Sequence, residues 1–216
     1  MKKLDVPFLP LTHRNPSIGE VSEQLNKLHK NAMDIAPWPA YDYKPAVAFT
    51  VAHNIDCLFI KYFVQEDAIR TVYRKTNDPV YRDSCVEFFI AFGDEAEYYN
   101  LEFNSLGTCM FGFGPAKDKR TLIPEAVSRK IKRRAALSIA PVPGAAGAVS
   151  WELSLQIPTR AFCFHQINSF RGQQCRVNFY KCGDDLPAPH FLSWSPIESL
   201  EPDFHLPQFF GTLQFN

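Results

Sequence analysis

From residue 44 to the C-terminus, hydrophobic side chains recur at every second position, as in Val47, Phe49 and Val51. This period places alternate side chains on one face of a β-strand. No helical period follows Ala32, so the crossover helices of a parallel sheet are missing. Turn residues separate the runs, a pattern typical of an antiparallel β-sandwich with jelly-roll or immunoglobulin-like layers. The expected strands, about nine, span 47–51, 58–64, 69–75, 84–92, 98–108, 128–139, 150–157, 176–181 and 211–215.

The N-terminal part has a different pattern. Residues 1–16 are rich in proline and aperiodic, and they predict an extended arm. Ser17 and Glu20 have the spacing of a capping box, and helical spacing of apolar residues predicts a short helix over 17–32. We therefore expect an arm and helix over 1–35 and one β-sandwich domain over 36–216. The Pro/Gly/Ala-rich stretch 141–148 is interpreted as a long hairpin loop inside that domain.

Composition excludes several classes of protein. The longest apolar run, 86–92, is far shorter than the ~20 residues of a membrane-spanning helix. The net charge of zero argues against a nucleic-acid-binding protein, so the basic run 129–134 is interpreted as an edge strand that deters edge-to-edge pairing. No apolar segment of a signal peptide follows the first residues. This predicts a cytoplasmic protein, or a periplasmic or secreted one if a leader has been trimmed.

The six cysteines give no metal motif, because no two of them lie three positions apart. The chain is also too long for a small disulfide scaffold. We expect reduced and mostly buried thiols.

Two neighbouring strands carry the candidate site. Glu87 lies on the polar face of the strand 84–92, and Glu102 lies on the polar face of the strand 98–108. The short turn 93–97 joins them as an antiparallel hairpin, which sets the two carboxylates close together. Like charges directly opposite one another are destabilising, and a cation, a shared proton or a hydroxyl-rich ligand would relieve that cost.

Other strands add amides, an arginine and a tyrosine to the polar positions, among them Asn178 and Tyr180. Such a face suits a sugar, whose hydroxyls pair with planar polar groups and whose C–H faces pack on aromatic rings. An ordinary solvated face of an antiparallel sheet has the same pattern. The pattern alone leaves both interpretations open.

Several segments, in order, resemble the family-9 carbohydrate-binding modules and, more closely, full-length family-9-like proteins of gut Bacteroidetes, which are related to DOMON domains. The matching segments are DSCVEFFIAF, YYNLEFNSLGT, WELSLQIP, RVNFYKCGDD, FLSWSP and FHLPQFFGTLQF. The resemblance spans roughly residues 36–216. It implies a β-sandwich that binds a saccharide without catalysing a reaction, as in carbohydrate catabolism.

The resemblance also implies a sugar held between two aromatic rings and hydrogen-bonded by acidic and amide groups. Here a tyrosine, Tyr81, precedes the first motif where the family pattern has a tryptophan. Characterised members hold structural calcium in acidic loops, for which 94–95 and 184–185 are candidates, and no other cofactor is implied. The candidate ligand-binding residues are Tyr81, Arg82, Asp83, Glu87, Asn100, Glu102, Asn178, Tyr180 and Trp194.

Two alternatives remain open. Glu87 and Glu102 have the residue types of a glycosidase pair, which would make the protein a hydrolase of O-glycosyl bonds. A DOMON-type haem or sugar-sensor domain is the other alternative, although haem needs axial ligands such as Met and His. The chain has three methionines and six histidines, the latter mostly in expected loops. We assign no catalytic residue, and the oligomeric state is left open.

Overall fold

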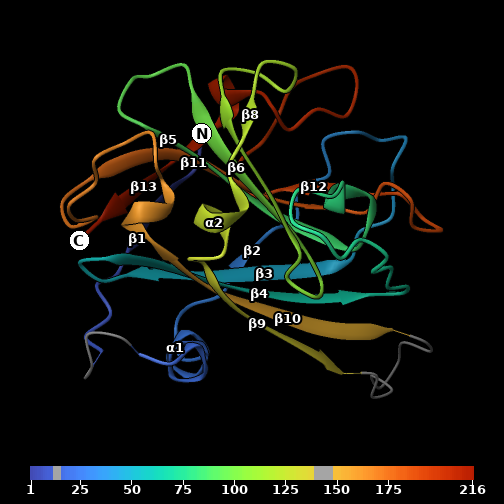
Figure 1. The fold of residues 1–216 in the computed structure, drawn as a ribbon. Coiled ribbons are helices and arrows are strands. Elements are labelled where there is room, and N and C mark those ends of the chain that lie inside the picture. Colours follow the sequence, from blue (N-terminus) through green and yellow to red (C-terminus); the bar gives the residue numbers. More distant parts are fainter. Residues whose placement is uncertain (12–15, 139–147) are drawn as a thin grey trace.

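The computed structural model describes residues 1–11, 16–138 and 148–216, which form a sandwich of two β-sheets (Figure 1). The predicted all-β sandwich is confirmed. Every strand pair is antiparallel except β1 with β13. Sheet A has the order β1 (Lys3–Val6), β13 (Gly211–Phe215), β11 (Gln174–Cys182), β5 (Cys85–Phe92), β6 (Tyr98–Asn104), β7 (Cys109–Gly114) and β8 (Thr121–Leu122), with β12 (Phe191–Ser193) paired to β11. Sheet B has the order β2 (Asn31–Ala32), β3 (Ala46–His53), β4 (Cys57–Glu66), β10 (Val149–Pro158) and β9 (Lys132–Ser138).

The predicted helix exists but is shorter than expected. Helix α1 spans Ile18–Leu25, and the capping box of Ser17 and Glu20 is present. The chain leaves the helix at Asn26, and strand β2 follows on the edge of sheet B. α1 packs on the outer face of sheet B, so residues 1–35 join both layers: β1 extends sheet A, while α1 and β2 belong with sheet B (Figure 1).

Three expected strand segments differ in the structure. The strand expected over 69–75 is wrong, because backbone N–H groups there donate to the side chains of Ser84 and Asp83 instead of to a neighbouring strand. The segment 98–108 ends as a strand at Asn104, and a turn with Gly107 at φ 82° leads into β7. The segment 128–139 begins in the short helix α2 (Glu125–Ser128) and becomes strand β9 at Lys132.

Short 3₁₀ turns connect the remaining elements at Val80–Arg82, Thr159–Ala161 and Pro207–Phe209. The expected hairpin loop 141–148 lies, except for its last residue, outside the described residues. β9 and β10, which flank it, pair antiparallel. None of the described helices is long and apolar enough to cross a membrane.

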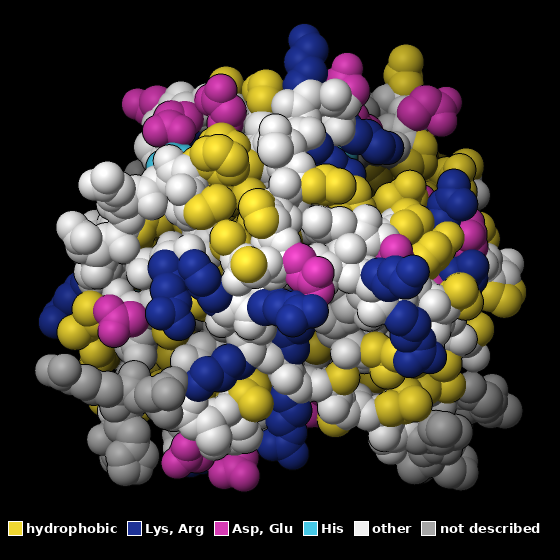
Figure 2. Space-filling view, in the orientation of Figure 1, with side chains coloured by type: hydrophobic (Ala, Val, Ile, Leu, Met, Phe, Trp, Pro, Cys, Tyr) yellow, Lys and Arg dark blue, Asp and Glu magenta, His cyan; other side chains and the backbone are white. Residues whose placement is uncertain are grey.

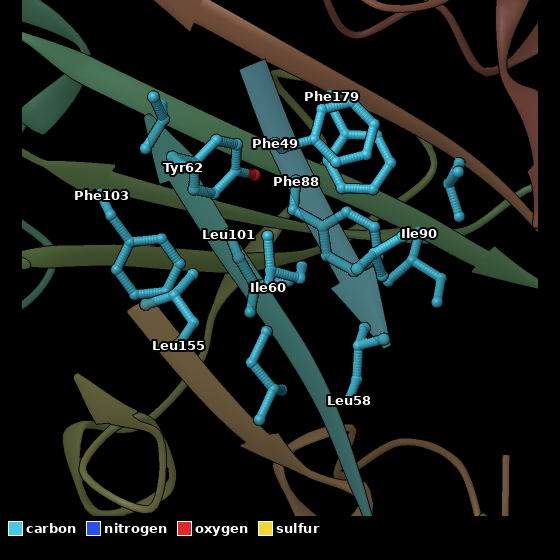
Figure 3. Close-up of a cluster of buried hydrophobic side chains, with 14 of the residues drawn as sticks. Phe49, Leu58, Ile60, Tyr62, Phe88, Ile90, Leu101, Phe103, Leu155 and Phe179 are labelled. Atoms are coloured by element: carbon cyan, nitrogen blue, oxygen red, sulfur yellow. The ribbon is translucent and has the colours of Figure 1, made fainter. Parts of the chain in front are cut away.

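The space between the sheets is filled by the alternating side chains that the sequence pattern marked. Phe49 of sheet B stacks on Phe179 of sheet A with ring centroids 3.8 Å apart. Trp151 is also buried here, as expected of its position on the apolar face of β10. Figure 3 shows side chains of both sheets meeting in this core, among them Phe49, Leu58, Ile60, Tyr62, Phe88, Ile90, Leu101, Phe103, Leu155 and Phe179.

One cluster of charged groups is fully buried between the sheets. The Lys181 ammonium of β11 lies 2.9 Å from the Glu66 carboxylate at the end of β4. Trp151 Nε1 donates to the other Glu66 oxygen at 2.6 Å, and Lys181 donates to His190 Nε2 at 2.7 Å. Burial lowers the pKa of His190 to about 4, so this ring is neutral near pH 7 and its Nε2 atom accepts a hydrogen bond from the Lys181 ammonium. The pair joins the two layers.

The cysteines lie as the sequence predicted, whereas the basic run 129–134 does so only in its second half, because residues 129–131 follow α2 and strand β9 begins at Lys132. β9 is an edge strand of sheet B. On the face shown in Figure 2, Lys and Arg side chains are spread among other residues and form no continuous stripe. All six cysteines are free thiols, and Cys163 is exposed while the others are buried.

Candidate functional site

The outer face of sheet A is covered by loops. Its side chains form a second hydrophobic cluster with the loop residues Trp38, Ile197 and Phe204. Phe204 stacks on Tyr180 of β11 with ring centroids 4.2 Å apart. The Trp38 Nε1 group donates to Ser199 O at 3.0 Å, which ties the two covering loops together. The polar face predicted from strand parity is therefore largely buried, and a ligand reaches it only where the loops leave an opening.

That opening is a pocket over β5, β6 and β11, called here the sheet A pocket. The space between its lining atoms is about 470 Å³ when the open solvent at its mouth is included. Its lining combines aromatic rings with charged groups, a composition suited to a polar ligand with apolar faces. The lining residues are Tyr81, Glu87, Glu102, Lys117, Arg120, Cys182, Asp184, Phe191, Pro202, Asp203, Phe204 and His205.

Glu87 and Glu102 form the floor of the sheet A pocket. They are directly opposite one another in the β5–β6 register, so the predicted juxtaposition is confirmed. Glu87 accepts from the Cys182 thiol at 3.1 Å. Glu102 accepts at its Oε1 from Asn100 at 2.7 Å and from Arg120 at 3.1 Å. Each carboxyl is thus held in place by groups on neighbouring strands or loops.

The two carboxyls are not equivalent electrostatically. Burial, and then the charge of Glu102, raise the pKa of Glu87 well above its ordinary value. Burial also raises the pKa of Glu102, but the Arg120 guanidinium opposes this shift. We infer that Glu87 carries the proton of the pair and Glu102 the charge. The repulsion expected between two facing carboxylates is therefore relieved by the proton on Glu87 together with the Arg120 guanidinium beside Glu102.

Arg120 connects Glu102 to a histidine on the other wall. Its Nη1 donates to Glu102 and lies 3.2 Å from His205 Nε2, while His205 Nδ1 lies 2.8 Å from the Tyr98 hydroxyl. Burial, Arg120 and Lys117 lower the pKa of His205 to about 3. Gly112 permits this arrangement, because a Cβ there would lie 2.6 Å from the Asn100 Oδ1 atom and 3.1 Å from the Arg120 Cδ atom.

Two buried oxygen atoms on β6 have no hydrogen-bond partner in the described part of the chain. They are Oε2 of Glu102 and Oδ1 of Asn100. Leaving a buried acceptor unsatisfied costs about 1–3 kcal/mol. Glu102 lines the pocket, so a ligand that donates a hydrogen bond to its Oε2 atom would recover this cost, whereas Asn100 is hydrogen-bonded to Glu102 but does not itself line the pocket.

The three candidate residues just before β5, Tyr81, Arg82 and Asp83, differ in their exposure and contacts. Tyr81 is half-buried and lines the sheet A pocket, whereas Arg82 is exposed and does not line it. Asp83 is fully buried, where it accepts from Arg70, from the backbone N–H groups of residues 72 and 73, and from Asn104. Its carboxylate is therefore occupied in holding the 70–73 segment.

The three candidates of the C-terminal part are buried. Asn178 hydrogen-bonds the backbone of Ser195 in both directions, at 3.1 and 2.8 Å. Tyr180 donates to Phe204 O at 3.1 Å, and its ring supports the wall of the pocket. Trp194 is only 4% exposed and lies between the sheets beside Phe49 and Phe179, not in the sheet A pocket. Trp194 therefore cannot stack on a ligand in the sheet A pocket. Side chains of the FLSWSP segment alternate between the two faces of the sheet, and Phe191 of this segment lines the pocket while Trp194 faces the core.

Several lining residues were not among the candidates. Cys182 could have been found by strand parity, since it shares a face with Tyr180 two positions earlier. Phe204 and His205 lie in the quoted segment FHLPQFFGTLQF, but without a strand period nothing in that segment indicates where they face. Lys117 and Arg120 come from the β7–β8 connection, and no sequence pattern predicts which way a loop folds.

The loop acids expected to hold calcium do not converge. Asp185 faces Arg70 at 3.5 Å, and Glu95 faces His165 at 3.0 Å. Within the described ranges, three His, Cys, Asp or Glu side chains meet at one place only, formed by Cys85, Glu87 and Cys182. These residues do not fit a calcium site, which requires six to eight oxygen ligands.

The buried His205 makes stability depend on pH. An unfolded chain takes up a proton on this histidine near pH 6.5, while the folded protein resists protonation down to about pH 3. Acidification therefore favours the unfolded state over this interval. We expect wild type to lose about 1–2 kcal/mol more stability between pH 7.5 and 5 than His205→Gln does. Urea unfolding at both pH values measures this difference, with the exposed His29→Gln as control. Equal losses in wild type and His205→Gln would contradict the assignment.

The fold and the pocket together define a β-sandwich with a small-molecule site on the outer face of one sheet. A profile described as carbohydrate-binding family 9 matches residues 20–215. This chain belongs to that family. A search of curated proteins finds no match.

Solved structures agree with this membership. A proposed carbohydrate-binding protein from Bacteroides uniformis is 38% identical, with a TM-score of 0.91 over 100% of this chain and 99% of the other. A family-9 carbohydrate-binding module from Caldicellulosiruptor kristjanssonii, in complex with glucose, gives a TM-score of 0.59 at 12% identity over 100% and 96% of the two chains. Its cellotriose complex gives 0.62 at 14% identity over 99% and 93%. These last two show the similarity of the fold.

Proposed function

We propose that this protein binds a saccharide in the sheet A pocket and performs no chemistry on it. The observation that carries the proposal is the Oε2 atom of Glu102 at the floor of an aromatic-walled pocket, which is buried and has no hydrogen-bond partner among the described residues. Sugar hydroxyls are donors and can satisfy such an oxygen. Membership of carbohydrate-binding family 9 supports the same ligand class.

The walls suit the rest of a sugar ring. Tyr81, Phe191 and Phe204 supply apolar surface for its C–H faces. Arg120 and Lys117 supply donors for ring or hydroxyl oxygens, and charged partners make the stronger hydrogen bonds. The similar module from Caldicellulosiruptor kristjanssonii was solved with glucose and with cellotriose, so glucose and short cello-oligosaccharides are the first probes to test.

The position of the two glutamates supports binding over hydrolysis. A glycosidase places its acid and its nucleophile or base on either side of the scissile bond. Here Glu87 and Glu102 stand next to one another on one sheet face, and both would approach a ligand from the same side. Glu102 is further occupied by Arg120 and Asn100.

A glycan array with purified protein tests the proposal, with glucose and cello-oligosaccharides included. We expect binding of at least one saccharide class, and no release of reducing ends in a parallel assay on the bound saccharide. An array with no bound saccharide would reject carbohydrate binding. Release of reducing ends, abolished in Glu87→Gln, would instead establish the hydrolase alternative.

The family resemblance implies a structural calcium, which the positions of the loop acids do not support. Melting of wild type in excess EGTA and in excess calcium tests it. Because the loop acids do not converge, we expect equal melting temperatures. A rise of several degrees with calcium would show a site built from other oxygens.

A further inference from the structure

Three metal-binding side chains meet beneath the sheet A pocket. Cys85 of β5 and Cys182 of β11 are directly opposite one another in the strand register, and Glu87 follows two positions along the same face of β5. Their ligand atoms all lie within 4.8 Å of one another, and the Cys182 sulfur is 3.1 Å from a Glu87 oxygen. All three side chains are nearly fully buried, with at most 3% exposed. Three rigid, adjacent strand positions thus aim two sulfurs and one oxygen at a common point.

The donor set favours a particular class of ion. Thiolates bind zinc and other thiophilic ions, whereas calcium and magnesium require oxygen ligands. In a tetrahedral zinc site with Zn–S distances of about 2.3 Å, two sulfurs lie about 3.8 Å apart. In this structure the two sulfurs lie at most 4.8 Å apart, about 1 Å more than in such a zinc site. Rotation of the cysteine side chains can bring them closer by this amount.

The surroundings also favour a cation. Besides the ligand Glu87, the sheet A pocket is lined by three acids, Glu102, Asp184 and Asp203, against two permanent cations, Lys117 and Arg120. Oε2 of Glu102, across the strand from Glu87, is buried without a partner in the described residues. Cys182 and Glu87 line the pocket, while Cys85 lies behind them. An ion held by all three would therefore keep one coordination position directed at the pocket.

We propose that Cys85, Cys182 and Glu87 form a binding site for a thiophilic divalent ion, with zinc as the best match and the fourth position open to the sheet A pocket. The site is distinct from the calcium expected in acidic loops. It does not depend on the proposed saccharide binding.

Titration of the reduced, chelator-treated protein with cobalt(II) tests the proposal. We expect one cobalt per chain, a thiolate-to-cobalt charge-transfer absorption, and loss of that absorption on adding zinc. Cys182→Ser and Glu87→Gln should each weaken cobalt binding at least tenfold. Cys163→Ser, which removes the exposed thiol, should bind as wild type does.

Two results would overturn the proposal. One is the absence of a charge-transfer absorption in folded, reduced wild type. The other is an absorption of unchanged strength in the double variant Cys85→Ala/Cys182→Ala. The wild-type titration needs no variant, so it decides the matter even if a substitution prevents folding. Circular dichroism of each sample confirms that the protein tested is folded.

Discussion

Replacing Lys181 with methionine is expected to lower the free energy of unfolding by about 3–5 kcal/mol. The substitution would leave the Glu66 carboxylate between the two sheets without its cation, in a place where neither group is exposed to water. His190 Nε2 lies 3.7 Å from the same carboxylate, but burial, the largest cause of its lowered pKa, persists in the variant and opposes a charge on this ring. Urea denaturation at pH 7 measures the loss.

The double variant Glu66→Gln/Lys181→Met is the control for this prediction. Glutamine keeps an oxygen that accepts from Trp151 Nε1, and methionine keeps the volume of the lysine stem. Removing both charges together is often neutral or stabilising. We therefore expect most of the lost stability to return. A double variant as unstable as Lys181→Met would show that the single loss comes from packing and not from an unpaired charge.

Replacing Trp194 with alanine is expected to cost about 3–5 kcal/mol of stability, the scale of large-to-small changes in a core. The indole is 4% exposed and packs edge-on against Phe49 and Phe179, and its ring fills the space that Gly211 leaves without a side chain. Thermal or urea unfolding measures this cost.

Tyr81→Ala is the matched comparison, because Tyr81 is an aromatic residue at the rim of the sheet A pocket. It should cost about 1 kcal/mol or less, since the ring is only half-buried. The opposite ranking, a stable Trp194→Ala that loses saccharide binding and a destabilised Tyr81→Ala, would contradict the placement of both rings.

The core and its register could be predicted from the sequence because a period of two leaves few choices. One residue of slip between β5 and β6 would turn one of the two glutamates toward the apolar space between the sheets, and the observed register, with Glu87 opposite Glu102, avoids that. Trp151 followed from the same parity. Strand β7 was missed even though Cys109, Phe111 and Phe113 keep the period on its core side, because Gly112 and Gly114 on its other face are typical of turns.

Only those residues of the site that lie on the strands of sheet A could be predicted from the sequence. The alternation of side chains along the strands predicted that Glu87 and Glu102 lie together. The family resemblance predicted Tyr81, at the rim of the pocket, as a ligand-binding residue. Arg120 and His205 arrive from loops, whose paths depend on packing across the outer face of sheet A. Asp83 and Asn178 are polar residues on the expected face, yet their hydrogen bonds hold backbone segments in place. The sequence pattern is the same for a polar side chain that hydrogen-bonds the backbone and for one that is free to bind a ligand.

Calorimetric titration with the saccharide that binds best on the array tests the central claim most directly, using wild type, Glu102→Gln and the control Glu125→Gln. Glu125 is an exposed carboxylate on α2 whose partner is Arg129. A hydrogen bond to a charged group contributes about 1.5–3 kcal/mol. We therefore predict at least tenfold weaker binding for Glu102→Gln, and wild-type affinity for Glu125→Gln. Wild-type affinity in a folded Glu102→Gln protein would contradict saccharide binding in the sheet A pocket.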